Sequence, residues 1–184
     1  MDEIVIFERL ESDFKYLQSL GYNVLGVFLQ GSQNYGLSDK DSDIDTKAII
    51  IPTLDEIVKN SQPVSTTLVL KTNEHIDVKD IRLMHKNFEK QNIDFIEILF
   101  TKFRLINEKY AHLYQPMFDN AEQIAHFNEV AAVKAVRGMA KEKYHALTHD
   151  YPSKQYEIAK WASTLNSFII FYGLRNSSEG ILTA

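Results

Sequence analysis

The sequence contains no cysteine, and this absence removes several kinds of chemistry at once. Disulfide scaffolds, thiolate zinc sites and cysteine nucleophiles all require a residue that the chain does not have. Any catalytic or binding chemistry must therefore come from carboxylates, histidines, hydroxyl groups, amines or a bound metal.

Long apolar runs are also absent, and none approaches the roughly 20 residues of a membrane-spanning helix. Residues 1–21 carry acidic side chains where a signal peptide carries basic ones. We therefore expect a cytoplasmic protein with no membrane partner.

An excess of charge of either sign is missing as well, because the net charge is only −5 over 184 residues. Such a chain does not coat nucleic acid through its overall charge, so a polyanionic partner would need a local basic surface. The apolar content of 45% is enough for one substantial core.

Apolar spacing predicts a mixed α+β fold. Between Ile4 and Leu20 apolar residues recur every three or four positions, which is typical of an amphipathic helix. Short apolar runs rich in β-branched residues predict strands, and Asp80 is a candidate helix N-cap. The strands are expected at residues 23–30, 43–52, 65–72, 74–80 and 102–107.

The pattern becomes helical from about Tyr110, with Pro152 as the clearest break. We expect a mixed β-sheet flanked by helices in residues 1–108, which would form the catalytic core. Residues 109–184 would form a helical C-terminal region.

Four aspartates alternate in the loop that precedes the second strand, and two of them suit a metal site. On a strand Asp43 and Asp45 leave the same face while Ile44 packs on the other. Two adjacent carboxylates repel each other, and a divalent cation relieves that repulsion. Asp77, an acid among apolar neighbours on a later strand, is the candidate third ligand for Mg²⁺ or Mn²⁺.

Gly31 and Ser32 directly follow the first strand, where they suit a phosphate. Glycine allows close approach of the backbone, and serine adds a hydroxyl donor. Phosphate at one end of the loop and metal at the other describe a nucleoside triphosphate, such as ATP, with its metal ions.

Three other interpretations of the aspartates were weighed. An EF-hand loop fails because Ile44 stands where glycine is needed and Ile50 where the bidentate glutamate is needed. A solvated surface turn and the bare D-x-D of glycosyltransferases remain, but neither accounts for the Gly31-Ser32 pair.

Together the strand ending in Gly31-Ser32, the pair Asp43 and Asp45, and the later Asp77 resemble the nucleotidyltransferase superfamily of DNA polymerase β. The strings "GSQNYGL", "DSDID" and "NIDFIEILF" resemble more narrowly the YcgL-like predicted nucleotidyltransferases of bacteria and their phages. This likeness covers roughly residues 20 to 105. The helical residues that follow are only loosely similar, and they could be a shortened form of the helical tail that members of the family have.

The resemblance implies a two-metal enzyme that moves a nucleoside monophosphate to an acceptor hydroxyl and releases pyrophosphate. Asp43 and Asp45 would bind both ions, and Asp77 would bind the ion beside the acceptor. The acceptor could be an RNA end, a protein or a small molecule. Members of the narrower group usually differ at Gln33, Lys47 and Ala48, which bears on base or acceptor preference and not on the carboxylates.

Several further residues are weaker candidates. Lys47 should share the face of Asp45 and could reach a phosphate, and Ser42 could bind nucleotide or merely shape the turn. His75 shares the face of Asp77, although a lone histidine at a strand start is usually only exposed.

Two features of the helical region have both a structural and a functional interpretation. Lys134, Arg137 and Lys141 recur on one helical face, which suits nucleic acid or a triphosphate tail, but the interleaved acid Glu142 favours an ordinary solvated face. The aromatic residues from Trp161 to Tyr172 are spaced as helix core. The alternative to an enzyme is a nucleotide- or partner-binding regulatory module without turnover, such as an antitoxin-like domain or a phage counter-defence protein.

Overall fold

The computed structural model describes residues 3–35 and 42–148 of the chain. The predicted break at Pro152 and the aromatic residues from Trp161 to Tyr172 lie outside this range. Within it, no helix is long and apolar enough to cross a membrane.

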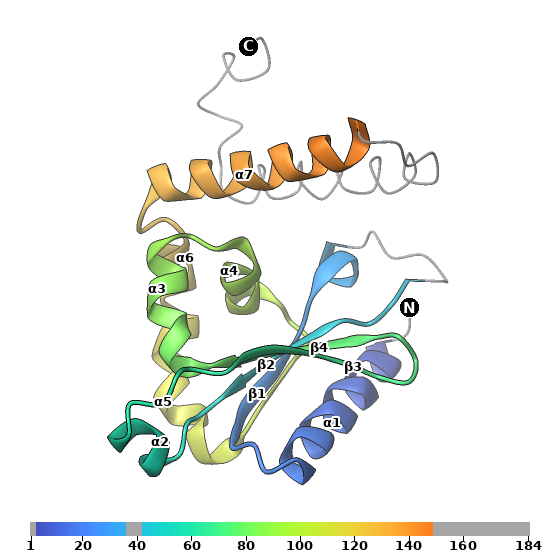
Figure 1. The fold of residues 1–184 in the computed structure, drawn as a ribbon, viewed down its shortest axis with the longest axis vertical. Coiled ribbons are helices and arrows are strands. Elements are labelled where there is room, and N and C mark those ends of the chain that lie inside the picture. Colours follow the sequence, from blue (N-terminus) through green and yellow to red (C-terminus); the bar gives the residue numbers. More distant parts are fainter. Residues whose placement is uncertain (1–2, 36–41, 149–184) are drawn as a thin grey trace.

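Helices and strands are interspersed up to the last strand, and the described residues after it, 107–148, form helices (Figure 1). The strands are β1 (Val24–Leu29), β2 (Thr46–Ile50), β3 (Ser65–Val69), β4 (His75–Asp80) and β5 (Arg104–Ile106). The α-helices are α1 (Glu3–Ser19), α2 (Leu54–Val58), α3 (Met84–Glu89), α4 (Ile93–Phe100), α5 (Glu108–Asp119), α6 (Ala121–Ala125) and α7 (Glu129–Thr148). Two short 3₁₀ helices are η1 (Gly31–Tyr35) and η2 (Ile81–Leu83).

The described strands form one mixed sheet in the order β3-β4-β2-β1-β5. β2 pairs in parallel with β4, and the other neighbours are antiparallel. Because β1 runs against β2 and β4, the end of β1 and the starts of β2 and β4 meet at the same edge of the sheet. The register places Leu29 opposite Thr46 and Thr46 opposite Ile76.

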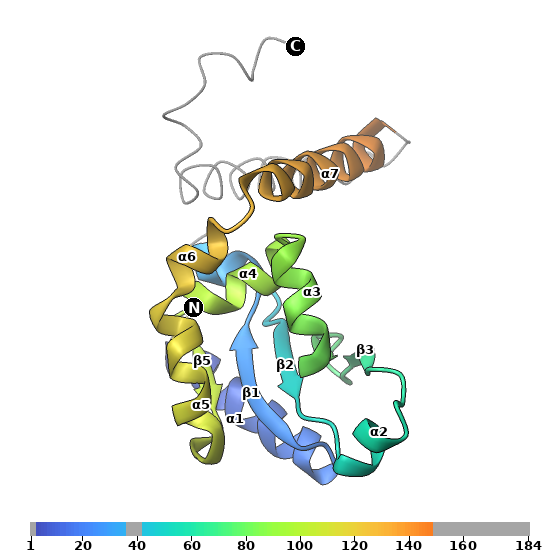
Figure 2. The same cartoon turned by 90° about the vertical axis from the view of Figure 1, so that its left-hand side faces the viewer.

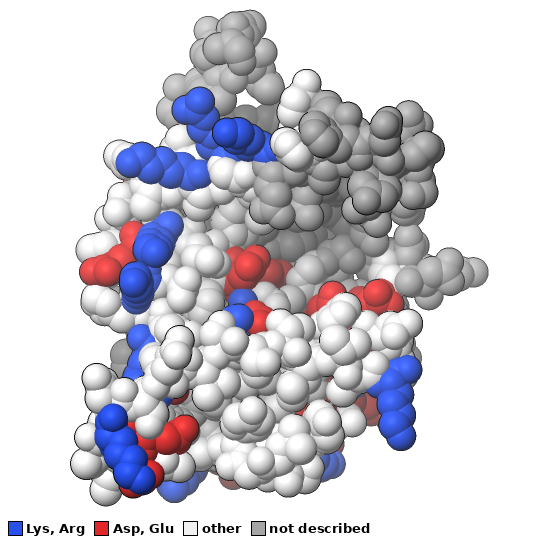
Figure 3. Space-filling model, in the orientation of Figure 1, with Lys and Arg blue, Asp and Glu red and all other residues white. Residues whose placement is uncertain are grey.

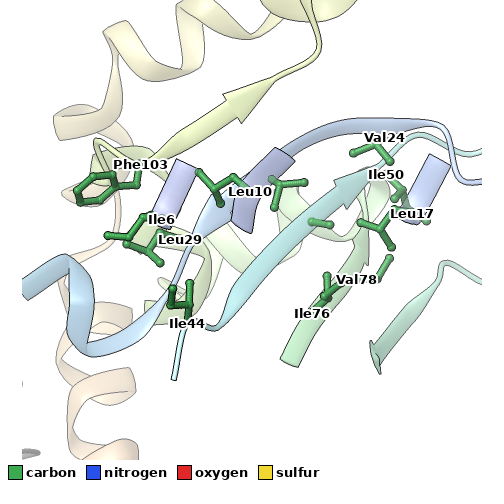
Figure 4. Close-up of a cluster of buried hydrophobic side chains, with 12 residues drawn as sticks. Ile6, Leu10, Leu17, Val24, Leu29, Ile44, Ile50, Ile76, Val78 and Phe103 are labelled. Carbon is green, nitrogen blue, oxygen red and sulfur yellow. The ribbon is translucent and has the colours of Figure 1, made fainter. Parts of the chain in front are cut away.

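One face of the sheet packs on α1 through a dry hydrophobic core (Figure 4). Leu10 and Leu17 of α1 are fully buried, and they lie over Ile50 and Val78 of the central strands. The helix presents these residues because they lie seven positions apart, close to two helical turns.

The opposite face carries the helices α3, α4 and α5, which lie on the other side of the sheet from α1 (Figure 2). Phe28 of β1 is fully buried there beside Phe95 of α4 and Phe118 of α5. Gly26 of β1 allows β5 to approach, since a Cβ at this position would lie 2.9 Å from Ile106 Cδ1.

The α+β class and the mixed sheet expected from the sequence are confirmed for the described residues. The strands and the first helix lie where their patterns predict them. The proposed boundary after residue 108 falls at the first residue of α5, and α5 side chains pack on β1 as part of the core.

Asp80 closes β4 and caps η2, as its N-cap interpretation predicts. Its buried carboxylate accepts hydrogen bonds from the Arg82 backbone N–H at 2.8 Å and from Arg82 Nη2 at 2.7 Å. Burial by itself would raise the pKa of Asp80, but the Arg82 bonds outweigh it and hold the pKa below its usual value.

We expect Asp80→Asn to lower the free energy of unfolding at pH 7 by about 1–3 kcal/mol, because it weakens charge-assisted bonds to Arg82. A carboxyl with a lowered folded pKa stabilises the fold above its unfolded pKa and ceases to do so as the pH falls through the folded value. Urea unfolding at pH 7 and pH 3 checks this, since the difference between the two proteins should shrink at pH 3. An equal difference at both values would contradict it.

Candidate functional site

The strand edge where β1 ends and β2 and β4 begin brings together Gly31, Asp45 and His75. The N–H of Gln30 donates to the carbonyl of Asp45 at 2.9 Å, which ties the glycine turn to the segment before β2. The backbone N–H of His75 donates to Asp45 Oδ1 at 3.1 Å, and the His75 ring Nδ1 lies 3.3 Å from the same oxygen.

The segment before β2 alternates as the sequence predicts. Ile44 is buried in the core under α1, whereas Asp43 is exposed and Asp45 is half-exposed. The carboxylates of Asp43 and Asp45 are therefore accessible to solvent on either side of a buried residue.

Asp77 lies on β4 directly opposite Lys47 of β2, on the sheet face that carries α3, α4 and α5. Its carboxylate is 3.2 Å from Lys47 Nζ and 2.8 Å from Lys79 Nζ. The hydroxyl of Thr67 donates to it at 3.3 Å. The charge of Asp77 is thus balanced by two ammonium groups.

Lys47 is almost fully buried, with only 1% of its surface exposed. Its ammonium donates to the carbonyl of Asp94 at 3.2 Å and lies 4.6 Å from the centre of the Phe95 ring. Burial lowers the pKa of Lys47, and the nearby carboxylates of Asp94 and Asp77 oppose this effect. Lys47 therefore joins β2 and β4 to the start of α4.

Gly31 has a φ of +80°, which favours glycine over any residue with a side chain. A Cβ built on Gly31 would have no atom within 4 Å, so the strain of the backbone and not crowding selects glycine here. The turn leads into η1, which also contains the backbone of Ser32.

The glycine turn is held on α4 by the carboxylate of Glu97. Glu97 Oε1 accepts from the N–H of Gly31 at 3.0 Å and from Asn34 Nδ2 at 2.7 Å. The other end of the same amide, Asn34 Oδ1, accepts from the hydroxyl of Thr101 at 2.7 Å. Both ends of α4 therefore contact the edge: its start through Lys47, and its later turns through Glu97 and Thr101.

A buried polar network supports the edge from the α1 side. Thr46 donates to Asp13 Oδ2 at 2.6 Å, and Arg9 forms ion pairs with both Asp13 and Glu74. Glu74 Oε1 in turn accepts from the N–H of Ile44 at 3.4 Å. Burial raises the pKa of Asp13, although the bonds from Thr46 and Arg9 act in the opposite direction.

The predicted site residues thus fall into two groups. Asp43, Asp45 and Gly31 lie along one edge of the sheet, and half-buried Ser42 precedes them in the same segment. Asp77 and Lys47 lie one step inside the sheet and are bound to each other. No group of three or more His, Cys, Asp and Glu side chains with the arrangement of a metal site occurs among residues 3–35 and 42–148.

Two residues, His75 and Glu97, make contacts at this edge that the sequence did not predict. His75 contacts Asp45 through both its backbone and its ring, and its place opposite Asp45 follows only from the strand register. Glu97 lies 66 positions from Gly31, and no local pattern could pair them.

Comparison with known proteins gives no assignment. No family model, no curated protein and no solved structure matches the chain significantly.

Asp77→Asn should lower the free energy of unfolding by about 1–3 kcal/mol at neutral pH, because it leaves the buried ammonium of Lys47 without its carboxylate partner. Asp45→Asn should change stability much less, because the Asp45 carboxylate is half-exposed and has no ion pair with lysine or arginine among the described residues. Chemical denaturation of both variants checks the contrast. Equal losses of unfolding free energy in the two variants would contradict a specific contribution of the Lys47–Asp77 pair to stability.

Removing the Glu97 carboxylate should loosen the glycine turn. In Glu97→Ala the Gly31 N–H and the Asn34 amide lose their shared acceptor, so we expect faster amide hydrogen exchange across residues 31–35. Glu97→Gln keeps a carbonyl oxygen as acceptor and serves as the matched control, with exchange close to that of the unmodified protein. Equally fast exchange in both variants would mean that the charge of Glu97, and not its acceptor atom, holds the turn.

Proposed function

We propose that the protein is a metal-dependent nucleotidyltransferase that transfers a nucleoside monophosphate from a nucleoside triphosphate to an acceptor hydroxyl. The observation that carries this proposal is the strand edge itself. A strained glycine turn is hydrogen-bonded, through Gln30, to the segment that bears Asp43 and Asp45. This arrangement supports a phosphate contact at the turn beside a cation site at the two aspartates, which is what the resemblance in sequence implies.

The available donors fit a hard divalent cation such as Mg²⁺ or Mn²⁺. Asp43 and Asp45 supply solvent-accessible carboxylate oxygens without a lysine or arginine partner among the described residues. Oxygen donors with water and phosphate completing the shell are what Mg²⁺ prefers. Two bound ions would be held by Asp43 and Asp45, with Asp77 as the third ligand of one of them.

For Asp77 to act as a ligand, its carboxylate would have to keep its ion pair with one lysine and exchange the other lysine for the metal ion. Lys79 is the more exposed partner, with 18% of its side chain accessible against 1% for Lys47. Exchange of Lys79 for a cation leaves the Lys47 pair, and with it the contact to α4, intact. The total charge facing Asp77 would then change little.

The reaction itself asks the protein mainly for positions and charges. Bound metal ions supply a lowered pKa for the acceptor hydroxyl and stabilise charge on the entering and leaving oxygens. The glycine turn would lie close to the phosphates, and Glu97, which accepts from the Gly31 N–H, would set the position of that turn from α4. Lys47, which we expected to contact nucleotide, would contribute through Asp77 and α4 because its ammonium is covered.

A regulatory binding module is the second candidate, and two contacts favour it. Asp77 is engaged by two lysines, and the Gly31 N–H is engaged by Glu97. Both groups are therefore satisfied without any ligand. A protein that only binds a nucleotide or partner would have no need to free them.

One variant distinguishes the nucleotidyltransferase from the binding module. Nucleotide binding by the unmodified protein should require a divalent ion, because the triphosphate would otherwise meet like charge at Asp43 and Asp45. We expect Asp43→Ala to abolish label transfer from an α-labelled nucleoside triphosphate and to remove most of the metal dependence of binding. Asp119→Ala, which removes an exposed carboxylate on α5, is the control.

Titration calorimetry with and without Mg²⁺ measures the binding, and release of pyrophosphate measures the transfer. Metal-dependent binding that survives in Asp43→Ala would refute the metal assignment. Tight nucleotide binding with no transfer to RNA, protein or small-molecule acceptors would favour the binding module.

A further inference from the structure

Five basic side chains on or directly beside two neighbouring helices have no acidic partner among the residues that the structure describes. None of them forms an ion pair with a described residue, and all are exposed: Lys86, Lys90, Lys134, Arg137 and Lys141. Five lysines elsewhere form such pairs, with Glu11, Asp77, Asp55 or Glu3: Lys15, Lys47, Lys59, Lys79 and Lys102. Lys71 and Lys109 are exposed and form none with a described residue. We call the five unpaired residues the basic surface.

The two helices of the basic surface are joined directly. Asn128, just before α7, donates to the carbonyl of Glu89 at the end of α3 at 3.4 Å. Phe88 of α3 packs in the same hydrophobic cluster as Val136 and Met139 of α7. Figure 3 shows basic side chains over α3 and along α7 on one face of the molecule, with acidic side chains beside those over α3 and again nearer the sheet.

The spacing within the basic surface matches a row of charges. Lys134, Arg137 and Lys141 lie at intervals of three and four residues, so they share one side of α7 and span about 10 Å along it. Lys86 and Lys90 are four residues apart beside α3. A strand with the rise of a DNA duplex, about 3.4 Å per phosphate, would place several phosphates along this row at once.

The sequence alone favours a solvated face here, because acidic residues are interleaved with the basic ones. The structure adds one observation for α3: Oε2 of its one acid, Glu89, lies 3.8 Å from His85 Nδ1, and no lysine pairs with Glu89 among the described residues. At physiological salt, charges farther apart than about 8 Å are largely screened. The net charge of −5 therefore does not prevent local attraction of a polyanion to the basic surface.

We propose that the basic surface binds the phosphodiester backbone of single-stranded nucleic acid. Under the proposed function, on which this one assignment rests, that strand is the acceptor of the nucleoside monophosphate. The helices lie on the side of the sheet that carries Lys47 and Asp77, and α4 packs between them and the glycine turn. A strand bound along α3 and α7 thus lies on the catalytic side and not on the α1 side.

Binding can be measured without catalysis, by fluorescence anisotropy of a labelled single-stranded RNA in the absence of metal and triphosphate. The test protein is the triple variant Lys134→Gln, Arg137→Gln, Lys141→Gln. Its matched control is Lys15→Gln, Lys59→Gln, Lys102→Gln, which changes the net charge equally but at exposed lysines of α1, α2 and the start of β5.

We expect the test variant to bind RNA about tenfold or more weakly and its salt slope to fall by about 2, because three phosphate contacts at about 0.7 each are lost. The control should bind like the unmodified protein. Equal weakening in both variants, or no RNA binding at low salt, would overturn the proposal.

Two further measurements isolate the kind of partner and the link to catalysis. Polyglutamate should compete poorly with RNA, and competition at equal charge concentration would show an acidic-protein surface instead. Asp43→Ala should bind RNA as the unmodified protein does, so a failure of nucleotidyl transfer leaves this result unaffected. Conversely, transfer to a small acceptor without RNA binding would reject the basic surface and retain the enzyme.

Discussion

The ammonium of Lys47 is the interaction on which the arrangement of this edge depends. It is nearly inaccessible to water, and it contacts the carboxylate of Asp77, the carbonyl of Asp94 and the ring of Phe95. A buried charge is costly unless it is paired and hydrogen-bonded, so β2, β4 and the start of α4 are held in one relative position. A shift of α4 would cost the ammonium its hydrogen bond to the Asp94 carbonyl and its contact with the Phe95 ring.

Fixing α4 has a consequence at its other end. The same helix carries Glu97 and Thr101, which hold the glycine turn through Gly31 and Asn34. The glycine turn and Asp77 are thus both linked to α4, although they come from segments far apart in sequence. The separation of the glycine turn from Asp77 is therefore set before any ligand arrives, and groups positioned in advance reduce the cost of ordering on binding.

The opposite side of the sheet makes a different contribution. There Arg9 joins Asp13 and Glu74, and through them it restrains Thr46 and Ile44 on either side of Asp45. The half-exposed Asp45 therefore lies between two residues that are restrained by contacts on the α1 side of the sheet. The edge combines an open carboxylate pair with a rigid backbone, whereas the basic surface on α3 and α7 is formed by long, unpaired side chains that can adapt to a polymer.

The sequence by itself determined the elements and the candidate carboxylates, because helical and strand periodicity and the spacing of Asp43, Asp45 and Asp77 are local properties of the chain. It also placed Gly31 at a turn, and the structure shows a φ of +80° there, which glycine adopts more readily than residues with a side chain. Only the tertiary structure decided which groups pair. The parallel register of β2 with β4 set Lys47 against Asp77 and Asp45 beside His75, and the packing of α4 brought Glu97 to Gly31. These contacts join residues 30 to 66 positions apart, and long-range register and helix packing depend on the whole core.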